Sequence, residues 1–145
     1  MNMAMRNQFA KTYAKTAVET AVTEASPHKL VEMLYEHSLK NLKLAKIFIE
    51  QKNYAKKAEH LNKALSLLAA LQAGLNHDKG KEVAENLAAL YDYCYRITVQ
   101  ASLQNDLDKI QEVIALLEPL LEAWKQMPEN LKRVSKQQLD SMGAL

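Results

Sequence analysis

At 145 residues, with a hydrophobic content of 48%, the chain is long enough for one domain with a buried core. Only three glycines and three prolines interrupt a sequence rich in helix formers, which predicts an all-α fold. A net charge of +2 without a basic cluster argues against nucleic-acid binding, and the single cysteine excludes an intrachain disulfide.

The sequence shows no sign of export or membrane insertion. Residues 1–8 lack the charged and then apolar pattern of a signal peptide. The most apolar run, residues 64–75, contains polar residues and is too short to cross a bilayer. We therefore expect a soluble, cytoplasmic protein.

The N-terminal segment, residues 1–25, has a weak apolar pattern and is predicted to be a partly ordered arm with at most a short helix. A strong helix start follows it. Ser26 can cap the free backbone amides, and Pro27 suits the first helical position. The apolar pattern carries this first helix to about residue 51. The apolar residues of the arm are Phe9, Tyr13, Val18 and Val22.

The second helix is expected from Tyr54 to about Leu75, after a turn at residues 52–53 in which Asn53 can act as the cap. Residues 74–80 contain two glycines among polar residues, which indicates the next chain reversal.

The third helix, residues 82–102, carries two neighbouring apolar stripes at helical spacing. Two apolar faces on one helix are more than a two-layer packing needs. Either this helix lies at the centre of a bundle, or one face serves something outside the chain. The first stripe is Val83, Leu87, Leu90, Cys94, Ile97 and Ala101, and the second is Ala84, Ala88, Tyr91, Tyr95 and Val99.

The fourth helix begins at Leu107, after a short turn with a good capping residue in Asp106. Pro119 is expected to kink this helix or to split it after Glu118. Beyond residue 125 the pattern loosens into a basic tail. Four helices with short connections predict an antiparallel up-down four-helix bundle over residues 26–125, between the arm and a flexible tail, residues 126–145.

Catalytic and metal-binding patterns are missing from the sequence. None of the four histidines, His28, His37, His60 and His77, follows a carboxylate at the spacing of a di-iron site, and we expect all four to be exposed to solvent. Cys94 lies on the apolar stripe and is expected to be a small buried hydrophobe rather than a nucleophile. We therefore expect no enzyme activity, no metal and no cofactor.

Apolar surface in excess of the core is the main functional signal. Small residues beside tyrosines on the third helix can form a shallow trough in which another helix lies. The alternative is that the same flank is simply core, and the pattern alone leaves both interpretations open. The residues of this candidate site are Leu67 and Leu71 on the second helix and Ala84, Ala88, Tyr91, Tyr95 and Val99 on the third.

Three stretches, in order, resemble the flagellar secretion chaperones that bind flagellin. The first is A-S-P-H-K-L-V-E-M-L-Y at residues 25–35. The second is A-G-L-N at residues 73–76, followed by Lys79-Gly80, Asn86-Leu87 and L-Y-D-Y at residues 90–93. The third comprises Asn105-Asp106, Ile110, Glu112-Val113 and E-A-W-K at residues 122–125. One departure is Gly80-Lys81, where the family often has two glycines.

The resemblance implies a helical bundle without catalytic activity. It also implies a cytosolic chaperone that holds the disordered C-terminal segment of flagellin, prevents premature polymerisation and keeps the subunit competent for flagellar type III secretion. The resemblance further implies that the N-terminal arm covers part of the binding surface when no client is bound. Tyr13 matches a tyrosine in the arm of the family. Tyr13 therefore joins the expected client-binding residues.

Two functions of different classes remain at this point. The first is the flagellin chaperone, with flagellar export or regulatory proteins as further candidate partners. The second is a self-associating structural bundle that forms a homodimer through its spare face and has no flagellin client. Co-purification with flagellin would distinguish them, because a structural bundle has no reason to retain it.

Overall fold

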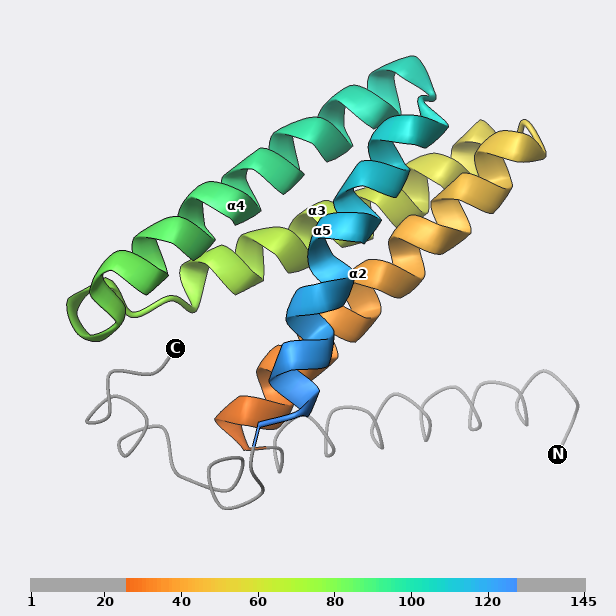
Figure 1. Ribbon diagram of the computed structural model, residues 1–145. Helices are drawn as coiled ribbons and strands as arrows, with labels where there is room; N and C mark the ends of the chain where they lie inside the picture. The colour runs from red at the N-terminus through yellow and green to blue at the C-terminus, as the bar shows by residue number, and fades with distance from the viewer. Residues whose placement is uncertain (1–25, 128–145) are drawn as a thin grey trace, which may run out of the picture.

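The computed structural model describes residues 26–127 as four helices, α2 to α5 (Figure 1). They are α2 (Pro27–Glu50), α3 (Tyr54–Ala73), α4 (His77–Gln104) and α5 (Leu107–Lys125). Figure 1 shows consecutive helices running in opposite directions, with short connections. Contacts join α2 to α3, α3 to α4, α4 to α5 and α2 to α5. The predicted all-α bundle is confirmed; the predicted arm and most of the predicted tail lie outside the described residues.

Each helix begins at a residue whose side chain accepts a hydrogen bond from the first turn. Ser26 accepts from the amide of Lys29 at 3.1 Å, and Asn53 accepts from that of Lys56 at 3.2 Å. Asp106 accepts from the amides of Asp108 and Lys109. These caps satisfy backbone donors that a helix leaves free at its N-terminus. The three predicted helix starts are therefore confirmed.

The start of α4 differs from the prediction. Asn76 accepts a hydrogen bond from the amide of Lys79 at 2.9 Å, so the helix begins at His77, inside the segment that was expected to be a loop. Lys81 interrupts it with φ 47° and ψ −121°, after one turn. The reversal between α3 and α4 is thus only residues 74–76 long.

Pro119 lies inside α5 without splitting it, because the helix runs continuously from Leu107 to Lys125. Of the two expected outcomes, a split is therefore wrong, and a kink stays a prediction. Proline cannot bond to the carbonyl four residues earlier, that of Ala115. Both residues lie on the exposed face of α5, where water can bond to this carbonyl instead. The expectation that the Ala115 carbonyl lacks its helical partner stays a prediction.

The core of the bundle is built from the inward stripes of all four helices. Its fully buried members include Leu42 on α2, Leu61 and Leu68 on α3, and Ile110 and Leu117 on α5. Helix α4 contributes smaller and more polar side chains. They are Ala84, Tyr91, Cys94, Thr98 and Ala101, all between 0% and 1% exposed.

One predicted solvent-exposed histidine is instead buried. His28 is 3% exposed, and its ring stacks on that of Trp124 in α5. His60 is half-buried and its Nδ1 donates to the Asn41 side chain at 2.9 Å. His37 and His77 are exposed, as expected. The partners of His28 and His60 are distant in sequence, so the pattern along the chain gave no sign of them.

The opposite end of the bundle is held by a buried lysine. The ammonium of Lys57, near the start of α3, donates to the Ser102 carbonyl at 2.9 Å and to the Asn105 side chain at 2.8 Å. A cation bonded at the C-terminus of a helix also interacts favourably with the helix dipole. Lys57 thereby ties α3 to the end of α4.

Candidate functional site

An apolar strip on the outward side of α4 is the best candidate for a binding surface. Tyr95 is 37% exposed, Leu103 is 80% exposed, and Ala88 and Val99 are half-buried. Helical spacing puts these four residues within about 80° of one another around α4. We call them the α4 flank. Leu103 was not among the predicted site residues, although its spacing from Val99 places it on the same face.

Tyr93 shows on which side of α4 this flank lies. Its hydroxyl donates to the carboxylate of Glu112 at 2.7 Å, so Tyr93 faces α5. Tyr95 lies roughly 160° further round the helix, on the side toward α3. The α4 flank therefore lies on the side of α4 that is nearer to α3.

Three predicted site residues belong to the core instead of the surface. Leu71 is 4% exposed, Ala84 0% and Tyr91 1%. Leu71 and Tyr91 come together beside a small cavity of about 40 Å³, which Val31 and Leu34 of α2 also line. In this conformation these three side chains have almost no surface to offer a partner.

Tyr91 is fixed by a buried hydrogen bond between its hydroxyl and that of Tyr35 on α2. Burial raises the pKa of both phenols, so both stay protonated at neutral pH. Two hydroxyls can satisfy each other in this way without water. The pair therefore serves as a polar link between α2 and α4 within the core.

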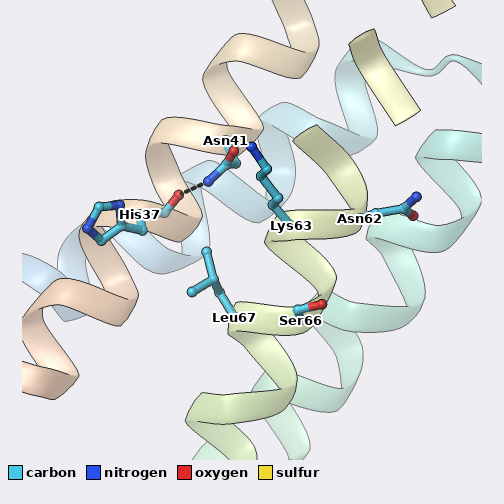
Figure 2. A pocket seen from close by; sticks show the side chains of 6 residues that line it. All are labelled: His37, Asn41, Asn62, Lys63, Ser66 and Leu67. Atoms are coloured by element: carbon cyan, nitrogen blue, oxygen red, sulfur yellow. Dashed lines mark hydrogen bonds between the residues drawn. The ribbon is translucent and has the colours of Figure 1, made fainter. Parts of the chain in front are cut away.

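Leu67 lies on another side of the molecule from Tyr95. It lines a groove of about 470 Å³ between α2 and α3, to which α4 contributes no residue. Figure 2 shows Leu67 and Lys63 pointing toward α2, while Asn62 points away from it. The other lining residues are His37, Asn41 and Ser66.

All the residues that line the α2/α3 groove, except Leu67, have polar side chains. The Asn41 amide donates to the His37 carbonyl at 2.8 Å (Figure 2). The Asn41 side-chain oxygen accepts from His60. Asn62, Lys63 and Ser66 are exposed, so their polar groups are open to solvent. The predicted site residues thus divide between this groove, the core and the α4 flank. Tyr13 lies outside the described residues.

Metal binding and thiol chemistry can be examined in the described part of the chain. No group of three histidine, cysteine, aspartate or glutamate side chains within residues 26–127 could hold a metal ion. Cys94 is fully buried, and burial raises the pKa of its thiol to about 11. A protonated, buried thiol is a poor nucleophile.

None of the four described helices has the length and apolarity needed to cross a membrane.

The model of the family described as flagellar protein FliS matches residues 9–131. The chain belongs to this family. The FliS family is one of chaperones and not of enzymes, and its members are named for flagellar secretion.

Individual relatives agree with the FliS family over most of the chain. A flagellar secretion chaperone FliS from Salmonella typhimurium is 47% identical over 81% of this chain and 87% of its own length. The Escherichia coli protein of the same name is 37% identical over 80% and 86%. The Bacillus subtilis one is 36% identical over 86% and 88%. The resemblance stated from the three sequence stretches is confirmed.

Proposed function

We propose that this chain is a cytosolic export chaperone that binds the disordered C-terminal segment of flagellin. By holding that segment, it prevents premature polymerisation and keeps flagellin competent for type III secretion. Membership of the FliS family supports the chaperone role. The observation that carries the choice of surface is the α4 flank, where neighbouring apolar side chains on one helix face remain open to solvent.

A disordered client suits a surface of this kind. Ordering such a client on binding costs about 2–5 kcal/mol or more, so many small apolar contacts are needed to offset the cost. The α4 flank offers a tyrosine and a leucine that are exposed, together with two small or branched residues that let a helix approach closely. The α2/α3 groove, with Leu67 at its side, can take a second part of an extended client.

Two exposed tyrosines on α4 provide a matched test. Tyr95 and Tyr93 are 37% and 38% exposed, but they face opposite sides of the helix. Tyr95→Lys is expected to weaken binding of a flagellin C-terminal peptide at least tenfold, because it puts a charge into the apolar contact. Tyr93→Lys, beside the carboxylate of Glu112, is expected to leave the affinity within a factor of two. Isothermal titration calorimetry measures both, and circular dichroism checks the helical content.

A second pair tests the same surface with small residues. Ala88→Lys is expected to weaken binding while helicity is retained, and Ala89→Lys, on the exposed side, is not. If Tyr95→Lys and Ala88→Lys bind the peptide as tightly as their respective controls, Tyr93→Lys and Ala89→Lys, the α4 flank is not the client surface. If the unchanged chain binds no flagellin but forms a dimer that Tyr95→Lys disrupts, the self-associating bundle is the better description.

A further inference from the structure

A second groove, of about 440 Å³, lies between α2 and α5. Its floor is apolar: Leu39 and Leu121 are buried, Leu44 is half-buried and Ile47 is 46% exposed. Exposed apolar surface in a groove costs free energy unless something covers it. In the ring of helix contacts, this groove lies on the side of the bundle opposite to the contact between α3 and α4.

One end of the groove lies close to the point where the described chain ends. Figure 1 shows the last turns of α5 beside the first turns of α2. Lys125 pairs with Glu36 there at 3.8 Å, and Met127 follows two residues later. Residues 128–145 therefore leave the bundle beside the groove.

The sequence of residues 128–145 has the length and the pattern to fill this groove. At helical spacing, Leu131, Val134, Met142 and Leu145 fall on one stripe, and Pro128 suits the first turn of a helix. Leu131 and Met142 are separated by the same number of residues as the groove-lining Glu36 and Ile47 on α2. Helices of equal length span equal distances, so a helix over these residues would match the groove in length.

One charge at the end of the groove suits the segment, although Lys40 and Lys43 also line the groove. Lys132, Arg133 and Lys136 all fall in the first half of the segment, which follows the end of α5. The Glu36 carboxylate lies at that end of the groove and is 41% exposed beside its partner Lys125, so it can accept a further cation. Glu118 pairs instead with Lys43, further along the groove.

We propose that residues 128–145 fold back over the groove between α2 and α5 and cover it as an amphipathic segment of the same chain. The covalent link gives the segment a high effective concentration at the groove, so a modest contact is enough. The segment would take the place of the flexible tail expected from the sequence. It would leave the α4 flank open, since that flank lies on the other side of the bundle.

Paramagnetic broadening in NMR spectra of the full chain tests this proposal. A spin label on Cys at position 40 (Lys40→Cys) lies at the rim of the groove, and a label at position 83 (Val83→Cys) lies on α4, where Val83 is 60% exposed. The Lys40 label is expected to broaden the amide signals of residues 131–142 strongly, and the Val83 label is not. Cys94 is buried and protonated, so it takes up little label.

Two nearby substitutions serve as the matched control. Val134→Asp puts a charge on the apolar stripe and is expected to abolish the broadening, whereas Gln137→Asp, about 100° from the centre of the stripe, keeps it. Equal broadening from both labels, or none from the Lys40 label, would overturn the proposal. Mixing spin-labelled chains with ¹⁵N-labelled chains gives the last arm: broadening between molecules would assign the groove to a second copy and also overturn it.

Discussion

His28 and Trp124 hold each other through two reciprocal hydrogen bonds and a ring stack. His28 Nε2 donates to the Trp124 carbonyl at 2.9 Å, and Trp124 Nε1 donates to the His28 carbonyl at 2.8 Å. The two rings are 4.7 Å apart and nearly parallel, at 8°. Because one residue is in the first turn of α2 and the other in the last turn of α5, the pair closes one end of the bundle.

His28→Ala is expected to destabilise the fold by about 1–3 kcal/mol, because it removes the stack and one of the two hydrogen bonds to the Trp124 carbonyl, leaving only that from the Met127 amide. Urea denaturation followed by circular dichroism measures this. Trp124 is the only tryptophan, so its emission is expected to shift to the red as well. His37→Ala, on an exposed position of the same helix, is the control and is expected to stay within about 0.5 kcal/mol. Equal effects of the two changes would contradict a structural role for the stack.

The Tyr35–Tyr91 pair predicts non-additive mutations. Tyr91→Phe leaves the buried Tyr35 hydroxyl without a partner, which is expected to cost about 1–3 kcal/mol. Adding Tyr35→Phe removes the orphaned group, so the double variant is expected to be no less stable than the single one. A double-mutant cycle from denaturation curves measures the coupling. Strict additivity would show that the two hydroxyls do not depend on each other.

Cys94 predicts a loss of stability at alkaline pH. Its pKa is about 11 in the folded state, mainly because burial opposes ionisation, against an ordinary value of 9.0. The unfolded chain therefore loses its thiol proton first, and the free energy of unfolding falls between about pH 9 and pH 11, by on the order of 2–3 kcal/mol. Cys94→Ala is expected to flatten this part of the pH profile. An identical decline in the variant would assign the effect elsewhere, for example to the two buried tyrosines above pH 10.

The N-terminal arm is expected to lie against the apolar binding surface in the free protein and to be displaced by client. A shortened chain that starts at Thr23 should then bind the flagellin peptide more tightly, because a competitor is gone, and should aggregate more readily. Calorimetry and light scattering measure the two effects. Tyr13→Ala should reproduce part of both, and Thr12→Ala should reproduce neither. Lower affinity without aggregation would mean that the arm contacts the client instead, and no change in either would make it a passive tail.

Helix positions were predictable because local chemistry decides them. Ser26, Asn53 and Asp106 are cap residues placed directly before apolar periods, and all three cap as expected. Asn76 was not recognised as a cap, because the glycine and the polar residues after it are also typical of a loop. The structure identifies Asn76 as the cap, because its side chain accepts a hydrogen bond from the Lys79 amide.

The division between core and binding surface was not predictable, because it depends on how α4 is rotated against its neighbours. Cys94 belongs to the first predicted stripe and Tyr91 to the second, yet both are buried, so the core lies between the two stripes. Tyr91 turns inward because Tyr35, 56 residues earlier, satisfies its hydroxyl. Val83 also belongs to the first predicted stripe, yet it is 60% exposed. Neither the partner of Tyr91 nor the exposure of Val83 can be inferred from the spacing of apolar residues along one helix.

The backbone of Lys81 has a consequence for the order in which the protein opens. Its φ of 47° lies in a region that favours glycine and costs a lysine about 1–3 kcal/mol. The turn formed by residues 77–80 is therefore attached to α4 through a strained joint, and its amides should exchange hydrogen for deuterium earlier than those of residues 90–100. Lys81→Gly, which restores the glycine pair often found in the FliS family, should relieve the strain and slow that exchange. In the unchanged chain, the first turn of α4 would therefore be the least stable part of the described bundle and would open before the core does.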